Sequence, residues 1–142
     1  VPPGHAPVGH RRALAEHHLP LEEVLIRGGD FTETGGYEAM QELLRLQPRP
    51  TAVFAANDMM AIGALIACHE AGLRVPEHIA IAGFDNIPAS RLVQPSLTTL
   101  DQHAREAGQR TSEMLLSRLD GSYIGPVRRE RVGFRLVQRA SA

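Results

Sequence analysis

Polar residues suited to binding a small molecule follow two apolar runs of this sequence, at the point where each run ends. Asn57 and Asp58 come directly after the run at 52–56, and Asp85 and Asn86 close the next such run. Carboxylate and amide oxygens accept hydrogen bonds from hydroxyl groups, which a polyol or a sugar presents in numbers. The question is therefore whether the polar residues at the ends of these two runs face the same ligand.

A third segment adds an aromatic ring to these polar residues. The stretch 28–31, Gly-Gly-Asp-Phe, follows a candidate strand at 22–27. The faces of sugar rings stack on aromatic side chains, so Phe31 is a candidate for such a contact.

The elements around these segments predict that they share one edge of a sheet. The runs at 52–56 and 79–84 are short and uniformly apolar, which favours strands buried on both faces. Apolar spacing predicts helices between and around the strands, at 10–18, 34–46, 58–71 and 102–119. Strands alternating with helices indicate a parallel sheet, whose ligands bind outside the carboxyl ends of the strands.

Local signals define the ends of several elements. Gly72 is placed to take the left-handed conformation after the helix at 58–71, and Leu73 can pack back on Cys68. The segment 88–95 reads as a turn-rich connection. The tail alternates apolar and polar residues at 131–136, which predicts one or two edge strands.

Each candidate residue also has a purely structural interpretation. Asn57 or Asp58 is expected to cap the following helix, which leaves the other free to point outward. Asp85 and Asn86 could form a turn closed by their own side chains, and Phe31 could belong to the core. The convergence of three segments favours a binding site over these separate roles.

Composition narrows the function classes. The chain has 142 residues, 43% of them hydrophobic, and a formal net charge of −1. This charge gives no electrostatic reason to bind phosphate backbones or anionic membranes. No apolar run approaches a membrane span, and the sequence shows no signal-peptide pattern. The single cysteine excludes an internal disulfide and fits a reducing compartment, so we expect a cytoplasmic location.

Catalysis, metal binding and nucleic-acid binding have weak support. Asp58 and Asp85 could form an acid/base pair, but no nucleophile motif, phosphate loop or metal ligand set accompanies them. His10, His17 and His18 lack the i, i+4 spacing of a metal site, so exposed helical histidines are expected. The arginines of the tail read as a solvated edge strand. We expect no enzyme activity, no metal and no cofactor.

The central segment resembles the effector-binding domain of LacI/GalR-type bacterial transcription regulators. The motifs that carry the resemblance are "GDFTETGGYEAMQELL", "PTAVFAAND", "MAIGAL", "GLRVPEHIAIAGFDN" and "QPSLTTLDQ". They extend over nearly the whole chain and together are highly specific for this family. The resemblance implies an α/β fold of the type I periplasmic-binding-protein-like kind, with a Rossmann-like parallel sheet and flanking helices, incomplete in this chain.

The resemblance also implies the roles of particular residues. The ring-stacking aromatic of the family falls on Phe31, its polar strand-end contacts fall on Asn57 and Asp85, and Gln102 lies near the mouth of the cleft. Surfaces that meet symmetry mates in the family would include Met59, Met60 and Leu92. The family pattern has an arginine where this sequence has Ala6 and an aromatic residue where it has His10, which argues against an ordinary sugar as the effector.

The family architecture implies three parts for this chain. Residues 1–97 would form the C-terminal subdomain without its first strand, and residues 98–126 would form a crossover and a helix of the N-terminal subdomain. Residues 127–142 would supply C-terminal strands. The helix at 102–119 would then pack on a subdomain that this chain lacks, which leaves its apolar stripe uncovered. A separate N-terminal domain would bind DNA.

The sequence thus predicts the effector-binding and dimerisation portion of a regulator that senses a sugar, a nucleoside-like compound or a similar small molecule. Such a homodimer would reach operator DNA only through its N-terminal domain, and no membrane is expected as a partner. The alternative is the sugar-binding component of a transport or chemotaxis system, which would need a secretion signal upstream.

Overall fold

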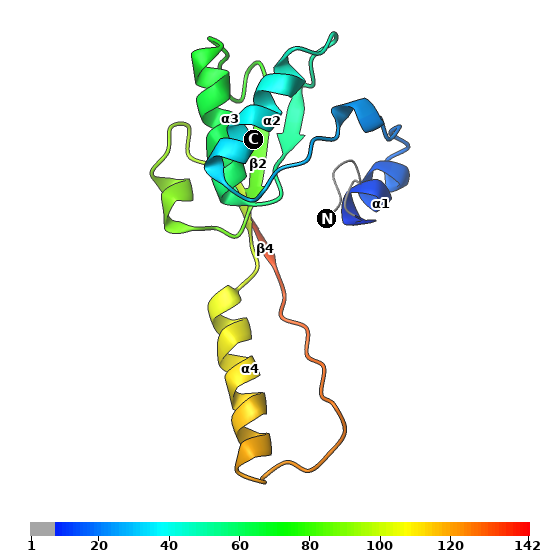
Figure 1. The fold of residues 1–142 in the computed structure, drawn as a ribbon, viewed down its shortest axis with the longest axis vertical. Coiled ribbons are helices and arrows are strands. Elements are labelled where there is room, and N and C mark those ends of the chain that lie inside the picture. The colour runs from blue at the N-terminus through cyan, green and yellow to red at the C-terminus, as the bar shows by residue number, and fades with distance from the viewer. Residues whose placement is uncertain (1–7) are drawn as a thin grey trace.

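The computed structural model describes residues 8–142, which form a four-stranded sheet, helices beside it and a long projecting arm (Figure 1). The strand order across the sheet is β1 (Ala52–Phe54), β2 (Ala80–Phe84), β3 (Thr98–Asp101), β4 (Arg135–Val137). β1, β2 and β3 are parallel, with Ala82 opposite both Phe54 and Thr98, whereas β4 runs antiparallel to β3. The predicted α/β class with a mostly parallel sheet is confirmed, and β4 is the edge strand expected in the tail.

Two helices cover the core side of this sheet. Helix α3 (Asp58–Glu70) packs against β2, and α2 (Glu33–Leu44) packs alongside α3. Their backbones approach closely at Gly36 and Gly63, where a Cβ would collide with the backbones of Met60 and Glu33. The core between these elements consists of buried apolar side chains, among them Met40, Leu43, Ala61, Leu65, Cys68, Ile79, Ile81 and Leu97.

The end of α3 follows its sequence signals. Gly72 has a φ of +69°. The amide of Gly72 donates to the carbonyl of His69, and that of Leu73 donates to the carbonyl of Cys68. These two bonds are the Schellman pattern that the glycine predicts. A short 3₁₀ turn, η2 (Pro88–Arg91), lies in the predicted connection at 88–95.

Two strand predictions need correction. The segment 22–27 was expected to be a strand, but it holds a 3₁₀ turn, η1 (Glu23–Leu25), and pairs with no strand among the described residues. A strand needs a hydrogen-bonded neighbour, and β1 is instead the outer strand of the sheet. β1 is not buried on both faces either, since Phe54 is 48% exposed. Phe54 and Ala52 point away from the core and line a cavity.

A long arm leaves the sheet and returns to it. β3 leads into α4 (Ala104–Leu119), which stands well away from the sheet, and the chain runs back beside it to β4 (Figure 1). No residue of α4 is buried. We call residues 102–134 the arm, and residues 28–101 together with 135–142 the body. Helix α1 (Val8–Glu16) lies to the side of the body and also has no buried residue.

The end of the chain closes the body. Ser141 is buried, its carbonyl accepts from the amide of Ile81 at 2.8 Å, and its amide donates to Ser96. Its hydroxyl accepts from the amide of Thr98 and donates to the carbonyl of Ile81. The residues after β4 are therefore wedged between the amino ends of β2 and β3.

Two further sequence-based expectations concern Ala6 and membrane spans. Ala6, which stands at the family's arginine position, lies outside the described residues. Across residues 8–142, no helix has the length and apolar character that crossing a lipid bilayer requires.

Candidate functional site

Phe31 and Asn57 are joined at the carboxyl end of β1. The side chain of Asn57 accepts a hydrogen bond from the amide of Met60 at 2.9 Å, which caps α3. Its Nδ2 donates to the carbonyl oxygen of Phe31, also at 2.9 Å. Phe31 adopts a left-handed φ of 66° and its side chain is 55% exposed. The side-chain amide of Asn57 thus caps α3 and also holds the loop that carries the Phe31 ring.

Asp85 and Gln102 are joined at the carboxyl ends of the next two strands. Asp85 directly follows β2, and Gln102 directly follows β3. Nε2 of Gln102 donates to Oδ1 of Asp85 at 2.7 Å. Burial and the neighbouring carboxylate of Asp58 raise the pKa of Asp85, while the bond from Gln102 opposes that rise. This carboxylate lies where water solvates it incompletely, and such a group gains from hydroxyl donors on a ligand.

Asp58 does not face outward. It has no solvent exposure, and its oxygens accept hydrogen bonds from the hydroxyl of Thr99 and from the amide of Ile87 at 2.9 Å. The expectation that the neighbour of the capping residue is free to point outward is therefore wrong. A Cβ on Gly83 would collide with this carboxylate, so the glycine makes room for it. Asp58 links α3 to β3 and to the turn after β2.

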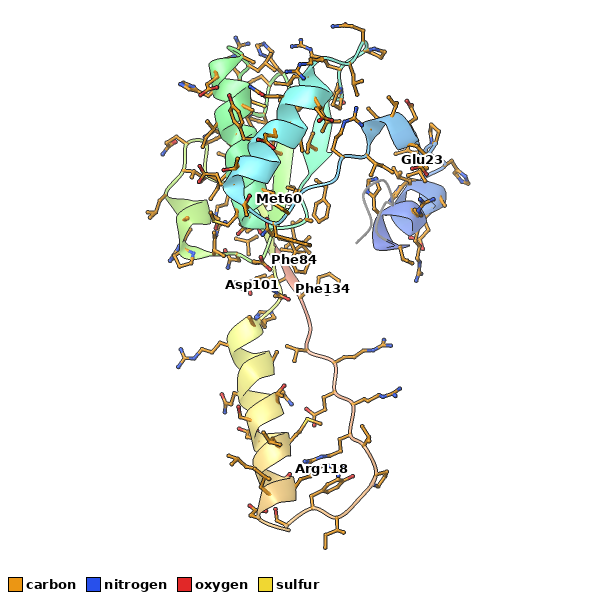
Figure 2. The ribbon with its side chains drawn as sticks, in the orientation of Figure 1. Glu23, Met60, Phe84, Asp101, Arg118 and Phe134 are labelled. Carbon is orange, nitrogen blue, oxygen red and sulfur yellow. The ribbon has the colours of Figure 1, made fainter. Side chains whose placement is uncertain are left out.

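The edge of the sheet beside these residues lies at the junction of body and arm. Figure 2 places Phe84, Asp101 and Phe134 together at that junction, with Met60 just above them. Asp101 pairs in register with Arg135, the residue after Phe134. The carboxyl ends of β2 and β3 thus lie where the body meets the arm.

A cavity of about 570 Å³ adjoins one end of this edge. Phe31 and Met60 line it, together with Phe54 and the segment 25–29, and its walls are mainly apolar. Asn57, Asp85 and Gln102 are not among its lining residues. The structure therefore joins the four predicted site residues in two hydrogen-bonded pairs at neighbouring strand ends, and Phe31 also lines an apolar cavity.

The residues predicted for dimerisation differ in exposure. Met59 is 38% exposed and Leu92 is 80% exposed, whereas Met60 is only 9% exposed and lies in the core. The side chain of Met60 fills the space that a Cβ on Gly29 would take, and its backbone fills the corresponding space at Gly36. Of these three residues, Met59 and Leu92 are the ones accessible to a second protein.

Sequence reasoning did not identify the side chains that support the site. Asn86 donates through Nδ2 to Oδ2 of Asp101 at 3.1 Å, and its backbone amide donates to the hydroxyl of Thr99. Arg139, near the end of the chain, donates to Oδ1 of Asn86. Asn86 stands in the quoted motif, but its partners are distant in sequence and carry no local signal.

Comparisons with known proteins agree with this fold. Residues 8–142 match the periplasmic binding protein-like domain family. The HTH-type transcriptional repressor PurR of Photorhabdus laumondii is 44% identical over 111 residues, which make up 78% of this chain and 33% of that protein. The chain thus spans about a third of the length of the curated relatives it matches.

Solved structures of regulators superpose closely on the chain. A complex of the transcriptional regulator CelR with cellobiose has a TM-score of 0.89 at 35% identity, over 94% of this chain and 41% of that one. A LacI family regulator from Enterococcus faecium with bound ribose has a TM-score of 0.86 at 33% identity, over 94% and 48%. The transcriptional repressor AscG of Escherichia coli has a TM-score of 0.84 at 36% identity, over the same shares.

The fold is an α/β fold with a mostly parallel sheet, as in the superposed regulators. The chain belongs to the periplasmic binding protein-like domain family, in the form that LacI-family transcription regulators use as their effector-binding domain. The relatives named above are transcriptional repressors and regulators, which confirms the expectation that the chain is not an enzyme.

Proposed function

We propose that this chain is the sensing and dimerisation part of a cytoplasmic transcription regulator, and that it binds a sugar or a nucleoside-like molecule. Phe31 stacks on a ring of the effector, and Asn57, Asp85 and Gln102 contact its polar groups. Binding shifts the angle between the two subdomains of the full-length protein. That shift changes how a separate N-terminal domain grips operator DNA.

The observation that carries this proposal is the pairing of the four residues across three neighbouring strand ends. The bond from Asn57 to Phe31 and the bond from Gln102 to Asp85 set an aromatic ring and a partly desolvated carboxylate along one edge. Aromatic faces and carboxylates are the groups that bind sugar rings and their hydroxyls. The sugars bound in two of the superposed regulators, cellobiose and ribose, support the same class of effector.

The fold also supports a two-part architecture. The arm, residues 102–134, interrupts the body between β3 and β4 and carries exposed apolar side chains on α4. We propose that the arm packs against the N-terminal subdomain, with residues 1–97 as the C-terminal subdomain and the crossovers near 98 and 127. The effector then lies in the cleft between the subdomains.

Dimerisation is the second component of the proposal. Met59, near the start of α3, and Leu92, in the connection after β2, are exposed apolar side chains. We propose that they meet the same residues of a second copy, and that Met60 supports Met59 from the core. Sedimentation of the full-length protein should show a dimer at micromolar concentration, and Leu92→Glu should shift it toward monomer.

The binding site is tested by a thermal-shift screen of sugars, nucleosides and small acids on the full-length protein. Asp85→Ala should abolish the shift that the best compound produces. Asp120→Ala is the matched control, because it removes an aspartate of the arm that is remote from the strand edge. A shift that survives Asp85→Ala at full size would contradict the proposed site.

A further inference from the structure

The turn after β2 holds two consecutive residues in the left-handed region of the backbone. Asp85 has a φ of 112° and Asn86 a φ of 55°, and neither is glycine. Such conformations cost free energy and persist only where surrounding contacts impose them. Asp85 is also the carboxylate proposed to bind the effector. The contacts that impose this turn therefore decide where that carboxylate points.

Arg139 supplies a charged contact to this turn from the far end of the chain. Its Nη2 donates to Oδ1 of Asn86 at 2.7 Å. Its Nη1 donates to the carbonyl of Leu97 at 2.6 Å and to the hydroxyl of Ser90 at 3.0 Å. The fork of one guanidinium thus joins the turn, the end of η2 and the residue before β3. Hydrogen bonds from a charged donor are stronger than neutral ones.

The bond from Arg139 also fixes the orientation of the Asn86 amide. Arginine only donates hydrogen bonds, so it must face the carbonyl oxygen of that amide. The NH₂ group then faces the carboxylate of Asp101, to which it donates at 3.1 Å. The backbone amides of Asn86 and Ile87 donate to Thr99 and Asp58 in the same turn. All of these bonds require the left-handed turn in its present position.

We propose that Arg139 is a positioning residue of the effector site, whose guanidinium holds the Asp85–Asn86 turn so that the Asp85 carboxylate meets Gln102 and the ligand. The inference rests on the proposed function for its consequence, because it gives the turn a role in binding. Arg139 touches no proposed ligand contact itself and acts through Asn86. It lies two residues after β4, in the segment that follows the return of the arm to the body.

The test substitutes Arg139→Lys in the full-length protein. Lysine keeps the positive charge but cannot reproduce the fork that reaches Asn86 and Leu97 together. Arg131→Lys is the matched control, an exposed arginine of the same returning segment. Two readouts need no effector: a carbon-13 titration of the Asp85 carboxyl, and hydrogen exchange of the amides of Asn86 and Ile87.

A positioning role predicts changes in both readouts. In Arg139→Lys the pKa of Asp85 should fall toward its ordinary value, because a relaxed turn carries the carboxylate into water and away from Asp58. Exchange at Asn86 and Ile87 should become about tenfold faster or more. Arg131→Lys should change neither. An altered melting temperature with both readouts unchanged would overturn the inference, since Arg139 would then only anchor the tail.

Asn86→Gly gives a second test if Arg139→Lys does not fold. Glycine tolerates the positive φ and removes the oxygen that Arg139 holds, while the bonds from Arg139 to Leu97 and Ser90 remain possible. The same fall in the pKa of Asp85 is expected. An unchanged pKa in this variant would overturn the inference equally.

Effector affinity separates this inference from the proposed function. If the Arg139→Lys turn spends only a tenth of its time in the binding position, affinity for the best sugar should fall about tenfold. Changed readouts at Asp85 with no sugar or nucleoside bound by the parent protein would leave the positioning role standing and reject the proposed function. Changed readouts with unaltered sugar affinity would overturn the role of Arg139 in binding.

Discussion

The body and the arm of this chain are held together by different forces. The body encloses a continuous apolar core, in which Ile81 and Leu97 have no solvent exposure. The arm holds its helix to its returning segment by polar contacts, such as Arg110 to Glu130 at 3.2 Å and the guanidinium of Arg128 to the carbonyl oxygen of Met114 at 2.8 Å. Exposed ion pairs contribute little free energy, whereas buried apolar side chains contribute most of it.

The arm nevertheless has apolar side chains to bury. The exposed fraction is 57% or more for three leucines of α4: Leu115, Leu116 and Leu119. It is 92% for Ile124 and 72% for Phe134, which follow α4 in the arm. The helix pattern is amphipathic in sequence, so its apolar stripe is typical of a packed helix. The comparison shows that an amphipathic helical pattern can belong to an element that packs within its own chain, as α2 does, or to one whose apolar side chains stay exposed in this chain, as in α4.

Leucine-to-alanine substitutions provide the largest test of this difference. In the 142-residue chain, Leu97→Ala should lower the free energy of unfolding by about 3 kcal/mol, because it leaves a cavity in the body. Leu116→Ala, at a side chain that is 60% exposed, should change it by less than about 0.5 kcal/mol. Urea denaturation measures both. Equal losses would show that the arm is packed in solution.

The amino ends of α3 and α4 provide a smaller test. Asn57 caps α3 through its side chain, whereas His103 precedes α4 with a φ of 51° and makes no side-chain cap bond. Asn57→Ala should cost about 1 kcal/mol. His103→Ala should cost less than about 0.5 kcal/mol, since no capping bond is lost. A larger loss at His103 than at Asn57, measured by the same denaturation, would contradict the assigned caps.

Local signals predicted the parts of the fold that depend on neighbours in sequence. Apolar spacing and Gly72 placed α3 correctly, and the abrupt ends of the apolar runs placed Asn57 and Asp85 at strand ends. The prediction of a strand at 22–27 failed because a strand depends on a partner that sequence spacing does not reveal.

The contacts that hold the site residues in place could not be predicted either, because they join residues that are distant in sequence. Asp58 reaches Thr99, which is 41 residues away, and Arg139 reaches Asn86, which is 53 residues away. A carboxylate next to a capping residue looks solvent-facing in sequence, and only the packing of α3 on the sheet turns it inward. The strand edge that we propose as the effector site was therefore predictable, and the distant contacts that hold its residues in place were not.

The two regions also predict opposite pH responses of their aspartates, and this is the smallest expected effect. In the body, burial and Asp58 raise the pKa of Asp85. In the arm, the hydroxyl and amide of Ser122 lower the pKa of Asp120. A carbon-13 titration should therefore find the inflection of Asp85 above the ordinary aspartate value of about 3.9 and that of Asp120 below it.

The sign for stability follows from these directions. A carboxyl whose pKa is raised on folding destabilises the folded protein above that pKa, and the penalty disappears as pH falls below the unfolded value. Asp85→Asn should therefore increase the free energy of unfolding at pH 7 and leave it unchanged near pH 3. Asp120→Asn should act in the opposite direction at pH 7, since ionisation of that carboxyl favours the folded arm. If Asp85→Asn also increases the free energy of unfolding at low pH, the substitution improves packing. The Asp85 carboxylate would then not be a partly desolvated charge that a ligand could stabilise.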